Sequence, residues 1–167
     1  ILGPESMDSG LVLLGLQSSG LHSNGFSLVR KHFTEPTREL IAPTRIYVKS
    51  ILAVKDALGS SLKGVANITG GGIYENVPRI LPKNVRAVIK DGSWEIPKVI
   101  LEVQKAAQMN KKELYATFNG GLGMVIAVEE SAKAQAMEIL TAHGDVVTEI
   151  GYTEERGEGG AVVIQGL

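Results

Sequence analysis

A loop rich in serine and glycine holds the residues of this sequence that are best suited to chemistry. It runs from Gln17 to Lys31, reads QSSGLHSNGFSLVRK, and lies between an apolar stretch and a stretch with helical spacing. The first backbone N–H groups of a helix have no partner inside the helix and attract anions, and glycines let the backbone come close. Hydroxyl, amide and imidazole side chains add hydrogen-bond donors. The pattern predicts a phosphate cradle made of Ser18, Ser19, Gly20, His22, Ser23, Asn24 and Gly25.

An ordinary strand–turn–helix connection is the alternative for this loop. In that case Ser23 or Asn24 serves only as the N-cap of the helix. The loop is not a P-loop, because that motif ends in Gly-Lys-Ser/Thr and no lysine of the loop precedes Lys31.

Two other glycine-rich loops are candidates to border the same site. Thr69 precedes three consecutive glycines, Gly70, Gly71 and Gly72, whose ordering costs much backbone entropy. Two arrangements account for three consecutive glycines despite this cost: close approach of a ligand to the backbone, or a tight turn that packing requires. The stretch TFNGGLGM favours a hairpin-like or bulged turn, with a ligand contact from Asn119 as the alternative.

The sequence offers little for acid–base or metal chemistry. Its three histidines, His22, His32 and His143, are scattered, it has no cysteine, and its aspartates lack the short paired spacing of a Mg²⁺ site. We therefore expect no metal site, and we assign no catalytic residue, with His22 as a candidate only. The chain is equipped to hold anions rather than to activate them.

Composition is that of an ordinary single-domain protein and excludes several classes of function. The 167 residues are 44% hydrophobic and 21% charged, which allows a real core in one domain. A net charge of −1 gives no drive toward nucleic acid or anionic membranes, and 5% aromatic residues are too few for base stacking. No apolar run reaches the roughly 18 residues of a membrane span. The lack of cysteine fits a reducing cytoplasm, and a first residue other than Met leads us to expect part of a longer chain.

Hydrophobic periodicity predicts strands that alternate with helices. Strands are expected at residues 11–16, 64–69, 86–90, 124–128, 146–150 and 161–165. Helices are expected from Gly25 onward and at residues 46–59, 93–108, 110–118 and 130–144. Their expected end signals are a Ser93 cap, a capping box of Asn110 and Glu113, and terminal glycines Gly59 and Gly144. This order predicts an α/β (α+β) fold, a single layered domain over residues 1–167 with a mixed β-sheet flanked by helices.

Short blocks along the chain resemble one enzyme family. In order, between Gly15 and Val128, they are SSGLHSNGFSLVRK, APTRIYVKS, NITGGGIYENVPRILP, GSWEIP and ELYATFNGGLGM. They resemble the C-terminal half of the aminoimidazole ribonucleotide synthetases, also called phosphoribosylformylglycinamidine cyclo-ligases. Two positions depart from the family pattern, since Asn67 stands where histidine is expected and Gly120 where a larger residue or cysteine is usual.

The resemblance implies an ATP-dependent cyclo-ligase of purine biosynthesis with twice the length of this chain. In such enzymes ATP activates the amide oxygen of formylglycinamidine ribonucleotide, a neighbouring nitrogen attacks, and ring closure releases ADP and phosphate. The N-terminal half carries most contacts to ATP and Mg²⁺ and forms the homodimer. The resemblance thus implies an N-terminal partner domain, a homodimer and a cytoplasmic location, and an inactive C-terminal half when isolated.

The resemblance also implies roles for the three loops. The serine- and glycine-rich loop is similar to the family's phosphate-contacting loop, which we assign to the substrate 5′-phosphate, with the ATP phosphates as the competing assignment. Thr69, Gly70, Gly71 and Gly72 resemble a second wall of a cleft between the two halves, with Asn119 beside them. Two other functions stay open: a related ATP-dependent synthetase of the same superfamily, and a free-standing phosphate-binding module without catalysis.

Overall fold

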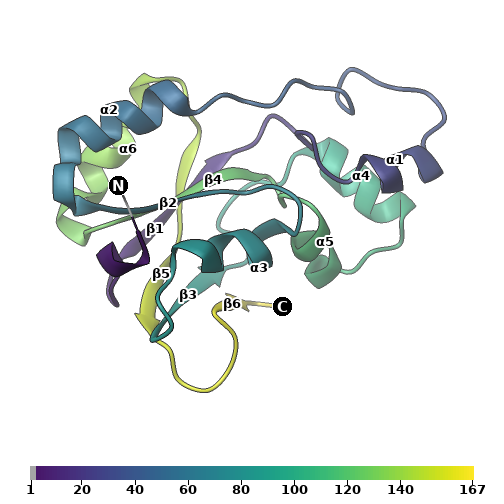
Figure 1. The fold of residues 1–167 in the computed structure, drawn as a ribbon. Coiled ribbons are helices and arrows are strands. Elements are labelled where there is room, and N and C mark those ends of the chain that lie inside the picture. Colours follow the sequence, from purple (N-terminus) through teal and green to yellow (C-terminus); the bar gives the residue numbers. More distant parts are fainter. Residues whose placement is uncertain (1–2) are drawn as a thin grey trace.

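A mixed β-sheet, built from the apolar runs of the sequence, forms the centre of the fold. The structure, a computed structural model, describes residues 3–167. Six strands lie in the order β2–β4–β1–β5–β3–β6 (Figure 1). Paired strands are antiparallel except β3 and β6, which are parallel, so the predicted mixed sheet is confirmed. The strands are β1 Val12–Gln17, β2 Leu62–Asn67, β3 Val85–Lys90, β4 Leu122–Val128, β5 Val147–Glu155 and β6 Val162–Gln165.

Helices cover both faces of this sheet, as predicted. They are α1 Phe26–His32, α2 Val48–Leu58, α3 Gly72–Asn76, α4 Lys98–Ala106, α5 Lys111–Thr117 and α6 Lys133–Ala142. Short 3₁₀ turns lie at η1 Pro4–Ser6, η2 Gly59–Ser61, η3 Val77–Ile80 and η4 Glu130–Ala132. Successive side chains of a strand point to opposite faces. Leu14 of β1 therefore packs in the cluster with α2 and α6, whereas Leu13 packs with Ile73 of α3 and Tyr115 of α5.

A third apolar cluster lies beyond one end of the sheet. It joins α1, α4 and α5, which gather at the right of Figure 1. Phe118, directly after α5, is fully buried in this cluster with Val29 of α1 and Ile100 of α4. The cluster thus holds the loops at this end of the sheet against one another.

Most of the predicted helix ends are confirmed. Asn110 and Glu113 form the capping box of α5, with N–H to side-chain oxygen distances of 2.8 and 2.9 Å. Gly59 follows α2, and Gly144 follows α6 with a left-handed φ of 79°. Both glycines allow a backbone conformation that ends a helix.

Two expectations about helix starts are wrong. Ser93 does not cap α4; its hydroxyl donates to the carbonyl of Lys90 at 2.8 Å, and the helix begins at Lys98. Proline disfavours helical geometry in the residue before it, so Pro97 stops the helix from extending toward Ser93. Neither Ser23 nor Asn24 caps α1, because Gly25 occupies the N-cap position without a side-chain hydrogen bond.

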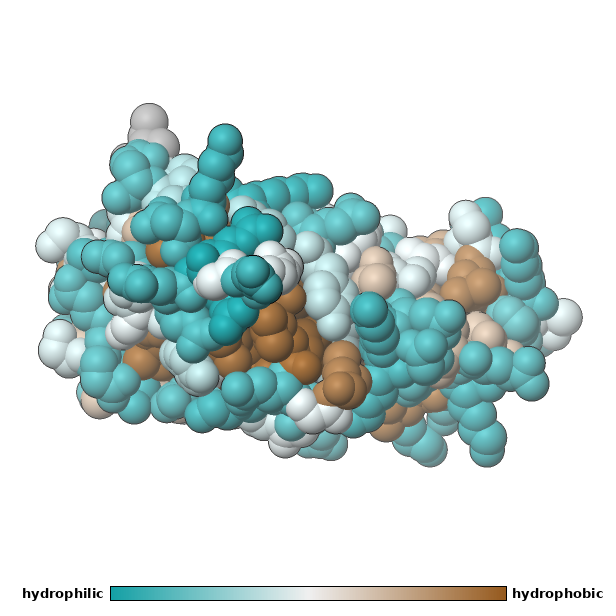
Figure 2. Space-filling view, turned by 90° about the horizontal axis from the view of Figure 1, so that it is seen from below, coloured by the Kyte–Doolittle hydropathy of each residue, from teal (hydrophilic) through white to brown (hydrophobic). Residues whose placement is uncertain are grey.

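The surface is hydrophilic over most of the face seen from below, with apolar patches between polar side chains (Figure 2). Within residues 3–167, no helix combines the length and the apolar character needed to cross a membrane.

Candidate functional site

The topology brings all three sequence-predicted loops to one edge of the sheet. Strand β4 lies between β1 and β2 and is antiparallel to both, with Gln17 paired to Leu122 and Asn67 to Met124. The carboxyl ends of β1 and β2 therefore lie beside the amino end of β4. We call the segments that leave the sheet here the first loop (residues 18–25), the second loop (residues 69–72) and the third turn (residues 119–121).

The first and second loops lie close together. A Cβ atom on Gly70 would lie 3.6 Å from Oδ1 of Asn24. Gly25 and Gly72 have φ angles of 74° and 57°, which favour glycine. A side chain on Gly25 would also collide with the ring of Phe118, and one on Gly72 with the backbone carbonyl of Tyr115. Phe118 and its neighbours are thus the surface on which both loops rest.

Free backbone donors mark the end of the first loop. Among residues 3–167, no acceptor pairs with the N–H groups of Gly25, Phe26 and Ser27. The first bonds of α1 run from Leu28 and Val29 to the carbonyl of Gly25, at 3.0 and 3.1 Å. Adjacent unpaired N–H groups are suited to an anion such as phosphate.

The serine hydroxyls of the first loop bind the protein itself. Ser18 donates to the carbonyl of Gly20 at 2.8 Å, and Ser19 to the carbonyl of Pro43 at 2.6 Å. Ser23 shares a hydrogen bond of 3.1 Å with the hydroxyl of Thr44. A hydroxyl has one proton to donate, so in this arrangement Ser18 and Ser19 shape the loop. Their contact with a ligand stays a prediction.

His22 is buried in the first loop and has a left-handed φ of 56°. Its Nε2 accepts the N–H of Ser19 at 3.2 Å, which requires a free lone pair on that nitrogen. Burial lowers the pKa of His22, because desolvation disfavours the charged imidazolium. The side chain is therefore a neutral part of the loop at pH 7 and adds no positive charge; its role in catalysis stays a prediction.

The second loop is closed by a residue that the sequence reasoning missed. The buried amide of Asn76 donates to the carbonyls of Gly70 and Gly72 at 3.1 and 2.8 Å. Oδ1 of Asn76 accepts the hydroxyl of Thr69 at 3.1 Å. The carboxylate of Glu75 lies over Gly71, where a Cβ atom would collide with it. This negative charge disfavours an anion at Gly71, so the second loop serves better as a wall than as a cradle.

Asn119 is fully buried and ties the third turn to the first loop. Its amide donates to the carbonyl of Gly20 at 2.8 Å, and its Oδ1 accepts the N–H of Gly121 at 2.9 Å. The Oγ of Ser18 lies 3.4 Å from the same Oδ1. The hairpin-like turn predicted here is wrong, because residues 119–121 connect helix α5 to strand β4 rather than two strands. A ligand contact from Asn119 stays a prediction.

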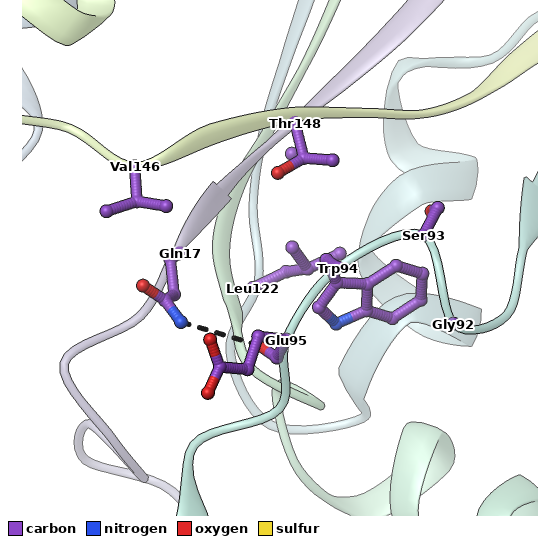
Figure 3. Close-up of a pocket in the computed structure, with 9 residues that line it drawn as sticks. Gln17, Gly92, Ser93, Trp94, Glu95, Leu122, Val146 and Thr148 are labelled. Atoms are coloured by element: carbon purple, nitrogen blue, oxygen red, sulfur yellow. Dashed lines mark hydrogen bonds between the residues drawn. The ribbon is translucent and has the colours of Figure 1, made fainter.

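Two hollows flank the loops. A groove of about 350 Å³ is lined in part by Thr44, Tyr47, Asn67 and Met124, so it reaches the Thr44 hydroxyl that contacts the first loop. A pocket of about 430 Å³ adjoins Gln17, and Figure 3 shows Trp94, Glu95 and Thr148 around it. None of the site residues that we predicted from the sequence lines this pocket.

Metal ligands are not gathered at the loops. Within residues 3–167, no cluster of three or more His, Asp or Glu side chains is placed to hold a metal ion.

Comparison with known proteins gives a consistent picture. The family described as "AIR synthase related protein, C-terminal domain" matches residues 8–164. The chain is 42% identical to the phosphoribosylformylglycinamidine cyclo-ligase of Methylobacillus flagellatus, over 98% of this chain and 51% of that protein. It is 44% identical to the enzyme of the same name from Neisseria gonorrhoeae, over 90% and 47%. The chain spans about half the length of the curated relatives it matches.

Solved structures show the same fold at low sequence identity. The hydrogenase maturation protein HypE from E. coli aligns with a TM-score of 0.70 and 20% identity, over 100% of this chain and 50% of that one. Thiamine monophosphate kinase from Aquifex aeolicus aligns with a TM-score of 0.60 and 15% identity, over 99% and 53%. At these low identities, the comparison shows a shared fold and nothing about function.

Proposed function

Because this chain belongs to the family of AIR synthase related proteins, as their C-terminal domain, we propose that it is the C-terminal half of a phosphoribosylformylglycinamidine cyclo-ligase. The observation that carries this proposal is the identity of 42% to such an enzyme along 98% of the chain. The activity is the ring closure of formylglycinamidine ribonucleotide to aminoimidazole ribonucleotide, a step of purine biosynthesis. HypE and thiamine monophosphate kinase resemble the chain in fold only, which gives no support to a different reaction.

The first loop binds the 5′-phosphate of the ribonucleotide in this proposal. The free N–H groups of Gly25, Phe26 and Ser27 supply donors, and the half-buried side chain of Asn24 lies where the first and second loops meet. The ATP phosphates are the competing occupant of this loop. Backbone donors that are fixed before the ligand arrives need no reorganisation when it binds.

ATP and Mg²⁺ belong mainly to the N-terminal half that the relatives carry. ATP supplies the phosphoryl group that makes the amide oxygen a leaving group. The residues of this chain bind and orient the ribonucleotide so that its nitrogen lies near the activated carbon, and such positioning accounts for much of the rate of an intramolecular attack. We expect the complete enzyme to be a cytoplasmic homodimer and this half alone to be inactive.

A chimeric enzyme tests the proposal. In it, this chain replaces the matching half of the Methylobacillus flagellatus relative, and the formation of aminoimidazole ribonucleotide is measured with ATP. We expect activity from the chimera and none from either half alone. Asn24→Ala should raise KM for the ribonucleotide and leave the melting temperature unchanged. A folded chimera without activity, or equal KM values for the chimera and Asn24→Ala, would contradict the proposal.

A further inference from the structure

A short segment about 20 residues after the first loop contacts that loop at two points. The connection between α1 and α2 contains no helix or strand and crosses the top of the molecule in Figure 1. Its last part, residues 43–47, accepts the hydroxyl of Ser19 on the carbonyl of Pro43 at 2.6 Å. The hydroxyl of Thr44 lies 3.1 Å from that of Ser23. The 43–47 segment thus holds the first loop from its outer side.

The same segment is fixed to the body of the protein by Arg45. Its Nε donates to Oδ1 of Asp145 at 2.8 Å, and its Nη2 donates to the carbonyl of Gly144 at 2.6 Å. The side chain of Asp145 is only 2% exposed and lies at the turn between α6 and β5. A guanidinium fixes direction as well as distance, because its donors form a rigid fork.

Tyr47 provides a second attachment. Its hydroxyl donates to the carbonyl of Gln17 at 2.7 Å, at the point where β1 ends and the first loop begins. The ring is buried beside His22, with ring centroids 6.3 Å apart. Both side chains occupy space that a side chain on Gly123 would fill. The segment is therefore held at its middle by Arg45 and at its last residue by Tyr47.

Only the Asp145 side of the Arg45–Asp145 pair is buried, since the Arg45 side chain is 35% exposed. Oδ2 of Asp145 is the one buried side-chain nitrogen or oxygen within residues 3–167 that has no hydrogen-bond partner. An unsatisfied buried carboxylate oxygen destabilises a fold, and a buried ion pair is weak evidence for stability. A role in fixing the position of a segment accounts for a pair that stability alone does not explain.

We infer that Arg45 and Asp145 are positioning residues for the anion site, acting through the 43–47 segment on Ser19 and Ser23. The inference rests on the proposed function for the identity of the bound anion, but the restraint on the first loop exists without a ligand. Arg86 and Glu154 provide a matched comparison, because they form a similar pair, with an Nε to Oε1 distance of 2.6 Å, on the strands β3 and β5.

The experiment compares Arg45→Lys with Arg86→Lys, which both keep the charge and lose the fork. Amide hydrogen exchange is measured first, without ligand. We expect faster exchange at Ser19 and Asn24 in Arg45→Lys than in Arg86→Lys. Equal exchange at these amides in the two variants would overturn the inference. If Arg45→Lys does not fold, Tyr47→Phe, which removes only one hydroxyl, replaces it.

Titration with inorganic phosphate then separates positioning from charge. Removing the negative charge of Asp145 favours an anion by electrostatics, so Asp145→Asn should tighten phosphate binding if charge alone matters. Because a misplaced contact loses affinity, we expect instead that Asp145→Asn and Arg45→Lys weaken it by about tenfold. Tighter binding in Asp145→Asn would overturn the inference. If the unmodified chain binds no phosphate, the assignment of the first loop in the proposed function fails, and the exchange data alone decide on the restraint.

Discussion

The first and second loops have similar backbones and different surroundings. Each follows a strand and opens a short helix, and each places a left-handed glycine at the N-cap, Gly25 with a φ of 74° and Gly71 with a φ of 84°. In the first loop the N–H groups of Phe26 and Ser27 have no partner within residues 3–167. In the second loop Asn76 binds the carbonyls and the carboxylate of Glu75 lies over Gly71. The difference teaches that two loops with the same glycine content and the same helix start can differ in charge and hydrogen bonding, because their neighbouring side chains differ.

The largest effect should come from filling the space at the base of the second loop. Gly72→Ala places a methyl group against backbone carbonyls at a positive φ, and we expect a loss of about 3 kcal/mol in the free energy of unfolding. Gly70→Ala is the matched control, because its nearest neighbour lies at 3.6 Å. Urea denaturation measures both variants. A Gly72→Ala protein as stable as Gly70→Ala would show that the two loops do not rest on α5 as described.

Removing the amide that closes the second loop should have the next largest effect. Asn76→Ala leaves buried carbonyl groups without donors, which should lower the free energy of unfolding by about 2 kcal/mol. Asn24→Ala, in the first loop, should change it by less than about 0.5 kcal/mol, since its side chain makes no hydrogen bond within residues 3–167. If the two variants lose equal stability, the contrast between a closed and an open loop is wrong.

The charge over the second loop should have a smaller effect on binding. Glu75→Gln removes a carboxylate beside Gly71 and should tighten phosphate binding by about twofold, because the charge is exposed and screened by salt. Glu138→Gln on α6 removes an equal charge from a distant surface and serves as the control. Calorimetric titration gives both dissociation constants, and a gain of the same size in Glu138→Gln would assign the effect to net charge.

The smallest effect concerns pH and the first loop. Burial lowers the pKa of His22 below its ordinary value of 6.5. Below pH 6.5 the unfolded chain therefore binds a proton that the folded chain does not, so stability is full above that pH and falls as the pH drops toward the folded pKa. We expect His22→Gln to lose less stability than the unmodified protein between pH 7 and 5. His32→Gln, on an exposed residue, is the control for the loss of an imidazole. Identical curves for all three proteins would contradict a buried neutral His22.

Local signals in the sequence were sufficient to predict most helices and strands and to place the three glycine-containing loops between them. The capping box of Asn110 and Glu113 and the glycines that end α2 and α6 act within a few residues, so their patterns are readable. The Ser93 cap failed because Pro97 delays the start of α4 to Lys98. Between them Trp94 enters the core, where its indole N–H donates to the carbonyl of Gly120.

The roles within the site depend on contacts between distant residues, which a sequence pattern does not contain. Asp145 meets Arg45 across 100 positions, and Asn119 meets Gly20 across 99. The hydroxyls of Ser18 and Ser19 looked like ligand donors by type, but nearby carbonyls take their protons. Asn76 gave no local signal in the sequence, and only its burial and hydrogen bonds show which carbonyls it holds.

The central claim is that the first loop, and not the second, binds the anion. Its most direct test is an NMR titration of the chain with ribose 5-phosphate, following backbone amide shifts. The account predicts saturable shifts that are largest at Gly25, Phe26 and Ser27 and small at Gly70 and Gly71. Shifts that are larger at Gly70 and Gly71, or no saturable shift at either loop, would contradict it.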